Sequence, residues 1–187
     1  MTMDITRVEQ LYRELLVAFG EDPDREGLRD TPRRAAGFWR DFLGYDAGRT
    51  DTAFAQEITG DHLVLVSGIR SWSMCEHHLL PIDLGVTIGY VPASSVLGLS
   101  KLVRITEMAA RRLQVQERIV ERIAAEVMKV TGSADVAVTG VGHHLCMSMR
   151  GVRSAGARTV TQSWHGRFPH DPHLAARMLS GTSEGKS

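Results

Sequence analysis

The chain has 187 residues, of which 43% are hydrophobic and 24% charged, with equal numbers of acidic and basic side chains. That length suits one domain with a real core, and the zero net charge excludes the overall basic field typical of nucleic-acid-binding proteins. The N-terminus lacks the basic start and apolar block of a signal peptide, and no apolar run is long enough for a membrane span. We therefore expect a cytoplasmic enzyme with no nucleic-acid or membrane partner.

The first 50 residues show helical periodicity. Apolar residues recur at helical spacing over positions 5–19, and Gly20 ends the run. Thr31 and Pro32 predict a second helix start, with Thr31 as N-cap and Pro32 at the first helical position. We expect two helices in this part of the chain.

The following residues predict paired strands and paired helices. The expected order is strand, strand, helix, helix, strand, strand, over positions 63–67, 86–91, 101–113, 115–130, 136–149 and 159–165. Strands joined as hairpins with helices grouped between them indicate an α+β fold. A small four-stranded antiparallel sheet leaves exposed edges, which favours an oligomer.

Both cysteines of the chain stand beside paired histidines. In a helical turn Cys75 and His78 share a face, because they are three residues apart. In a strand His144 and Cys146 share a face, because they are two residues apart. Thiolates and imidazoles are preferred ligands of zinc. The pattern predicts a zinc site, which is structural if all four side chains bind and catalytic if one position stays open.

Several ordered motifs resemble the GTP cyclohydrolase I family. They are SMCEHHLLP at 73–81, GLSK at 98–101, RLQVQER at 112–118, HLCMSMRGVR at 144–153 and DTPRR at 30–34. The resemblance runs from about position 20 to 166, nearly the whole folded chain. Several long motifs in the same order are far more specific than any single one.

The resemblance implies the T-fold, an antiparallel four-stranded sheet with two backing helices, here with added N-terminal helices. In the family, subunits join their sheets into an oligomeric barrel, typically a homodecamer with active sites between subunits. We expect one such domain over residues 1–179, with a helical part at 1–50, the T-fold core at 60–168 and a disordered tail at 180–187.

Roles for individual residues follow from the same resemblance. The implied Zn²⁺ ligands are Cys75, His78 and Cys146, which favours the catalytic form of the site. The implied catalytic residues are His77, His144 and Ser100, with the imidazoles handling a proton at N7 of guanine. GTP is the implied substrate, and the residues implied to bind it are Gln116, Glu117, Lys101, Arg104, Arg150 and Arg34.

The implied reaction is zinc-dependent. Water adds to C8 of the guanine, formate leaves, and the opened ribose rearranges and closes to give 7,8-dihydroneopterin 3'-triphosphate, the first step of tetrahydrofolate and pterin biosynthesis. Glu117 would accept hydrogen bonds from the guanine N1–H and 2-amino group, which adenine lacks. The cationic side chains would hold the triphosphate.

Three places depart from the usual family pattern: the stretch after Pro81, Gln162 and His143. They leave open whether the enzyme serves folate synthesis or a second pathway such as a deazapurine route. Two other hypotheses stay open. One is a T-fold nitrile reductase with a cysteine nucleophile, against which the complete Cys-Glu-His-His motif argues. The other is a non-enzymatic oligomer held by a four-ligand zinc ion.

Overall fold

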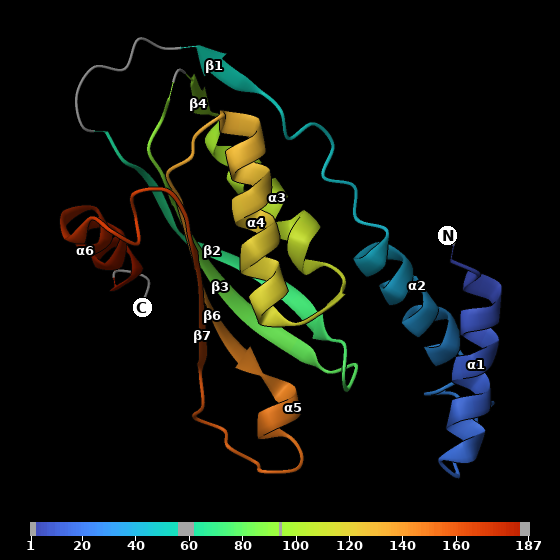
Figure 1. Cartoon of the computed structure of the whole chain (residues 1–187). Coiled ribbons are helices and arrows are strands. Elements are labelled where there is room, and N and C mark those ends of the chain that lie inside the picture. Colours follow the sequence, from blue (N-terminus) through green and yellow to red (C-terminus); the bar gives the residue numbers. More distant parts are fainter. Residues whose placement is uncertain (1–2, 56–61, 94, 184–187) are drawn as a thin grey trace. The chain divides into compact units, whose positions relative to one another are not determined.

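The structure is a computed structural model that describes residues 3–55, 62–93 and 95–183 (Figure 1). The chain forms two compact units, Met1–Tyr45 and Asp46–Ser187. Among the described residues, no helix combines the length and apolar character needed to cross a bilayer.

The first unit is a pair of packed helices, α1 (Ile5–Ala18) and α2 (Thr31–Leu43). The indole N–H of Trp39 on α2 donates to the hydroxyl of Tyr12 on α1, which ties the two helices together. Asp30 occupies the N-cap position of α2, one residue before the expected N-cap, without a side-chain capping hydrogen bond, and proline still occupies the first turn. Both helices expected in this part are confirmed.

The second unit is built on a five-stranded sheet with the strand order β5-β2-β3-β6-β7. All pairings are antiparallel except that of β5 with β2. The strands are β2 (Val64–Cys75), β3 (Pro81–Tyr90), β5 (Leu113–Gln114), β6 (Val136–His144) and β7 (Thr159–Trp164). The expected α+β class is confirmed, but the expectation of a four-stranded sheet missed β5, because two residues are too short for a periodic pattern.

Strand β2 extends eight residues beyond its expected end, from position 67 to Cys75. The pairing of β2 with β3 shifts register between Val66 and Ile69, and Gly68 in this bulge has a φ of 72°. A bulge interrupts the alternation of buried and exposed residues, so the sequence pattern ends there although the strand continues. The longer strand delivers Cys75 to the end of the sheet.

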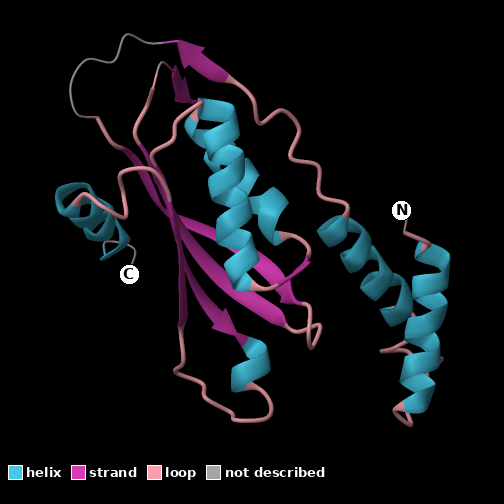
Figure 2. Cartoon of the chain, viewed as in Figure 1, coloured by secondary structure: helices cyan, strands magenta, loops and turns pink. Residues whose placement is uncertain are grey.

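A separate two-stranded sheet forms from β1 (Ala53–Ala55) and β4 (Ser95–Leu97). Helices α3 (Leu99–Ala110) and α4 (Gln116–Thr131) lie on one face of the main sheet, as expected (Figures 1 and 2). The core between these layers contains the fully buried residues Ile82, Leu84, Ile88, Leu102, Ile105, Ile119 and Ile123.

Helix α6 (Pro172–Ser183) lies on the opposite face of the sheet, where Leu174 and Met178 pack with Phe168 and Ala137 (Figure 1). The sequence did not predict this helix. Its residues 180–183 belong to the segment that we expected to be a disordered tail, whereas residues 184–187 lie outside the described part. Packing against the sheet, rather than a strong periodic pattern, stabilises such a helix.

Strand β6 ends at His144, and the chain turns directly into the short helix α5 (Leu145–Ser148). The expectation that the strand continues to Met149 was wrong. The N–H of Met149 instead donates to the carbonyl of Leu145 at 2.9 Å, closing a helical turn. Cys146 therefore lies on a helix and not on the strand that carries His144.

Candidate metal centre and active site

Three sequence-predicted ligands come together at the end of the sheet. Cys75, His78 and Cys146 each offer a ligand atom, and the three atoms lie within 4.8 Å of one another. Sγ of Cys75 is 3.7 Å from Nδ1 of His78. Tetrahedral zinc with bonds of about 2.3 Å to sulfur and about 2.0 Å to nitrogen places such atoms about 3.6 Å apart. The donor set and its spacing therefore fit a zinc ion.

The loop after β2 folds back tightly and so brings His78 over Cys75. The N–H of Cys75 donates to the carbonyl of Leu80 at 2.9 Å, and the carbonyl of Cys75 accepts from the N–H of Leu79 at 2.8 Å. Leu79 has a φ of 53°, in the left-handed region that non-glycine residues rarely adopt. Strained backbone of this kind persists where surrounding contacts hold it, often at functional sites.

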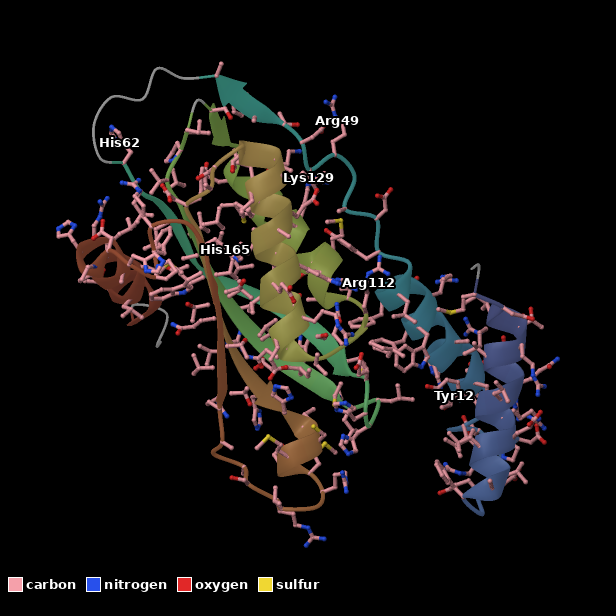
Figure 3. The ribbon with its side chains drawn as sticks, in the orientation of Figure 1. Tyr12, Arg49, His62, Arg112, Lys129 and His165 are labelled. Carbon is pink, nitrogen blue, oxygen red and sulfur yellow. The ribbon has the colours of Figure 1, made fainter. Side chains whose placement is uncertain are left out.

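The third ligand arrives through strand pairing. The antiparallel register of β3 with β6 sets Ile82 opposite His144, so β6 ends beside the loop that follows β2. Helix α5 then carries Cys146 to that loop, and sulfur atoms gather around α5 and the adjoining loop (Figure 3). Burial raises the pKa of the Cys146 thiol, and the adjacent Cys75 sulfur raises it further. A bound cation acts in the opposite direction and favours the thiolates.

His144 is not a member of this group, and its side chain contacts helix α4. Its Nε2 lies 2.7 Å from Oε1 of Gln116. Gln116 is 1% exposed, and its amide nitrogen donates to the carbonyls of Gly140 and Thr159 at 3.1 and 2.9 Å. This fixes the orientation of the amide, so its oxygen accepts the proton of Nε2 and Nδ1 of neutral His144 is left as an acceptor.

Charge around His144 acts in two directions. Burial lowers the pKa of His144, and the nearby Glu117 carboxylate partly offsets this by raising it. Glu117 is exposed in the first turn of α4, where the positive end of the helix dipole favours a carboxylate. The structure therefore places the expected guanine anchor in the neighbourhood of one expected catalytic imidazole. His77, the other imidazole, is exposed on the loop after β2.

An ion pair joins the loop after β2 (residues 76–80, here called the metal loop) to α4. This pair was not predicted from the sequence. Nη1 of Arg118 donates to Oε2 of Glu76 at 2.9 Å and to Oε1 of Gln114 at 3.3 Å. The N–H of Glu76 donates to the carbonyl of Gln114 at 3.1 Å. Both charged residues lie within the quoted motifs, but 42 positions separate them, so no local spacing signals their contact.

Within the second unit, the expected triphosphate ligands are not gathered in one place. Ser100 and Lys101 lie in the first turn of α3, beside β4 and at the far end of the helix layer from α5 (Figure 1). Arg104 follows on α3 and donates to the carbonyl of Ala47 at 2.7 Å. Arg150 is exposed just after α5. Arg34 lies in the first unit, on α2, 3.8 Å from Asp30.

Comparison with known proteins identifies the family to which the sequence belongs. A family model described as GTP cyclohydrolase I matches residues 8–183. The chain belongs to the GTP cyclohydrolase I family. A protein of Hyperthermus butylicus named GTP cyclohydrolase 1 is 49% identical over 93% of this chain and 89% of its own length. One of Clostridium acetobutylicum with the same name is 40% identical over 96% and 98%.

A more distant likeness is to a solved structure titled as the archaeosine synthase QueF-Like in the apo form. It has 16% identity and a TM-score of 0.47, over 58% of this chain and 97% of that one. Membership of the GTP cyclohydrolase I family confirms both the resemblance found in the motifs and the expectation of an enzyme. It favours the cyclohydrolase hypothesis over the reductase and over a non-enzymatic zinc oligomer.

Proposed function

We propose that the chain converts GTP to 7,8-dihydroneopterin 3'-triphosphate and formate in a zinc-dependent reaction, at the start of tetrahydrofolate and pterin biosynthesis. The observation that carries this proposal is the three-ligand group of Cys75, His78 and Cys146. His144 is outside this group and hydrogen-bonds to Gln116 instead. Three protein ligands leave the fourth position of tetrahedral zinc open, as in catalytic sites. A zinc ion held there supplies Lewis-acid chemistry and activates water near neutral pH.

His144 is suited to move a proton at the guanine. Because Gln116 holds the Nε2 proton, Nδ1 is the atom that takes a proton from the attacking water and delivers it to N7 of the ring. Burial favours the neutral imidazole, so the residue starts as an acceptor. His77, exposed on the metal loop, is the second candidate for this proton transfer.

Glu117 is suited to select guanine. Its exposed carboxylate lies in the first turn of α4 and is available to accept hydrogen bonds from N1–H and the 2-amino group. Adenine presents neither of these donors, so it would leave the carboxylate without hydrogen-bond partners. Discrimination against ATP follows from this loss.

The triphosphate site requires more than one chain. Helix α3 has 12 residues, so Lys101 at its start is separated from the metal loop at its other end by about 15 Å of helix. The outer edge of β2 is paired only at Met74 and Cys75, and β7 is paired only with β6 in the described chain. These open edges support a homo-oligomer, a decameric barrel in our proposal, in which one subunit's Ser100, Lys101 and Arg104 complete a neighbour's site.

The test is incubation of metal-quantified protein with GTP, with separate measurements of formate and of pterin fluorescence after oxidation. We expect both products, their loss on chelation and their return with zinc. Cys146→Ala should lose metal and both products. Formate without pterin would remove the role of Ser100 in the later steps. The absence of both formate and pterin with fully zinc-loaded protein would overturn the proposed reaction.

A further inference from the structure

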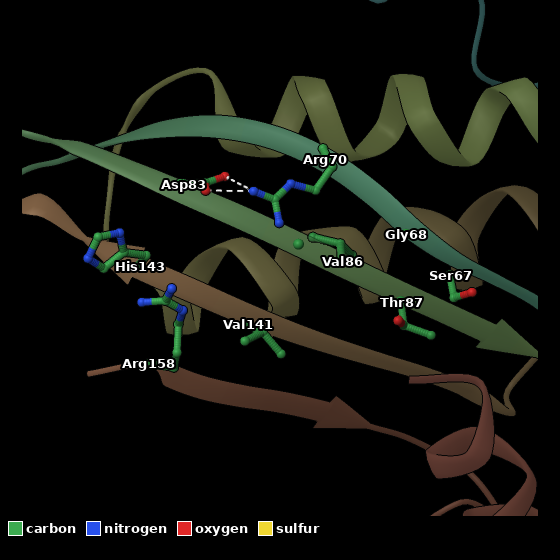
Figure 4. Close-up of a pocket in the computed structure, with 10 residues that line it drawn as sticks. Ser67, Gly68, Arg70, Asp83, Val86, Thr87, Val141, His143 and Arg158 are labelled. Atoms are coloured by element: carbon green, nitrogen blue, oxygen red, sulfur yellow. Dashed lines mark hydrogen bonds and ion pairs between the residues drawn. The ribbon is translucent and has the colours of Figure 1, made fainter. Parts of the chain in front are cut away.

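A pocket opens on the face of the sheet opposite α3 and α4 (Figure 4). Its volume is about 220 Å³, and it is lined by residues of β2, β3 and β6 and by Arg158 just before β7. Helix α6 covers the other half of this face through Met178 and Leu174. The pocket therefore belongs to the part of the sheet face that no helix of the described chain covers.

Strand register explains why charged side chains meet here. Asp83 on β3 is directly opposite His143 on β6, and the pairing of Gly142 with Thr159 brings Arg158 beside His143 in turn. Cross-strand neighbours project to the same face of a sheet. The pocket is separate from the metal centre, because His143 and His144 are consecutive strand residues and point to opposite faces.

The pocket carries more positive than negative charge. Nη2 of Arg70 lies 2.6 Å from both carboxylate oxygens of Asp83, so this pair balances itself. Nη1 of Arg70 makes no hydrogen bond with Asp83 and lies 3.7 Å from the position that a Cβ at residue 85 would occupy, at the bottom of the pocket. The guanidinium of Arg158 makes a 3.3 Å hydrogen bond to the adjacent carbonyl of Ala157, and no carboxylate lies within ion-pair distance of it among the described residues.

His143 supplies the second indication of a ligand. Its Nε2 is buried, yet within the described residues it has no hydrogen-bond partner. A buried polar atom without a partner costs free energy and is rare in native structures. A ligand atom in the pocket would satisfy it.

We propose that this pocket binds a small oxyanion of the phosphate class. Nε2–H of His143, the guanidinium of Arg158 and Nη1 of Arg70 are the donors, and the missing side chain at Gly85 leaves room above the strand. Arg70 neutralises Asp83, which would otherwise repel the anion. Guanidinium groups bind such oxyanions through charge-assisted hydrogen bonds. The site lies on the reverse side of the strand that carries His144.

The test is equilibrium dialysis of the full protein against radiolabelled inorganic phosphate at constant ionic strength. Arg158→Ala and His143→Leu should each weaken one class of phosphate sites by about tenfold or more, because a charge-assisted hydrogen bond is lost. Lys101→Ala should weaken only phosphate binding at the proposed triphosphate site, so the affinity of the pocket for phosphate should be unchanged in this variant. Arg158→Lys should retain part of the affinity.

Arg122→Ala is the matched control, because it removes the same charge from the exposed surface of α4 on the other side of the sheet. Unchanged binding in this control, together with the loss in Arg158→Ala, supports the pocket. Binding of Arg158→Ala and His143→Leu equal to that of the unmodified protein overturns it, as does an equal loss in Arg122→Ala. Size-exclusion chromatography and retained turnover of GTP by Arg158→Ala verify that the variant is folded.

Discussion

Oε1 of Gln116 and Nε2 of His144 lie 2.7 Å apart beside Gly142, a strand position where any side chain would meet both. A Cβ at Gly142 would overlap the Gln116 oxygen and lie 3.2 Å from Nε2 of His144. The contact between Gln116 and His144 therefore requires that position 142 has no side chain. A substitution at Gly142 should displace the His144 imidazole without removing it.

Gly142→Ala should lower GTP turnover by about 100-fold while the protein keeps its zinc, because a displacement of about 1 Å in a catalytic group has effects of that size. Steady-state kinetics and metal analysis check this expectation. Gly156→Ala is the control, since nothing lies within 4 Å of an added Cβ there. Normal turnover in Gly142→Ala would show that the Gln116 contact does not position His144.

His144→Ala should fold, keep its zinc and lose GTP turnover by about 100-fold or more, as expected for a lost acid–base group. His144 lies outside the group formed by Cys75, His78 and Cys146, which is the reason for expecting retained metal. Zinc content and formate release are measured on the same sample. Loss of metal from this variant would make His144 a ligand and refute its assigned role.

Glu117→Ala should raise KM for GTP by about 10- to 100-fold with zinc retained, because hydrogen bonds to a charged group are lost. The side chain is exposed, so the fold should be unaffected. Glu121→Ala offers the comparison, since it removes the same exposed carboxylate one turn later on α4. If Glu117→Ala has an unchanged KM, guanine is anchored elsewhere.

Arg118→Met should weaken zinc binding by about tenfold, because partners that orient a metal loop typically contribute that much to affinity. Its guanidinium holds Glu76, the neighbour of Cys75, against Gln114. Zinc affinity is measured by competition with a chromogenic chelator. Arg118→Lys should recover part of the affinity, and Arg122→Met, on the exposed surface of α4, should have none of the effect. Equal zinc affinity in the unmodified protein and in the three variants would show that the ion pair of Arg118 with Glu76 has no role in metal binding.

Asp171 should make the stability of α6 depend on acidity. Its carboxylate accepts from the backbone N–H groups of Leu174 and His173, and these bonds lower its pKa below the ordinary value of 3.8. A lowered folded-state pKa contributes stability above the unfolded value, and this stability is lost as pH falls through the folded value. Amide exchange in α6 should be faster in Asp171→Asn than in the unmodified protein at neutral pH. The difference should close as pH falls through the lowered pKa of Asp171, and a constant difference at all pH values would contradict the assignment.

Much of the fold was predictable from periodicity. The helix expected over positions 115–130 is Gln116–Thr131, and the last strand expected over 159–165 is Thr159–Trp164. The errors occur where periodicity is broken or absent. The bulge at Gly68 interrupts the alternating pattern, so the second half of β2 was not predicted. Helix α6 was missed because its contact with the sheet, rather than a strong periodic pattern of its own, stabilises it.

The sequence by itself determined that His78 can share a face with Cys75, because the local backbone geometry of a turn sets that relationship. The same local argument failed for His144 and Cys146, which lie on a strand and on a helix. Only the tertiary structure decided that Cys146 joins the other two ligands while His144 turns to Gln116, because the pairing of β3 with β6 and the change from strand to helix after His144 set those positions. Contacts between residues far apart in the chain depend on strand register and packing, which no local spacing encodes.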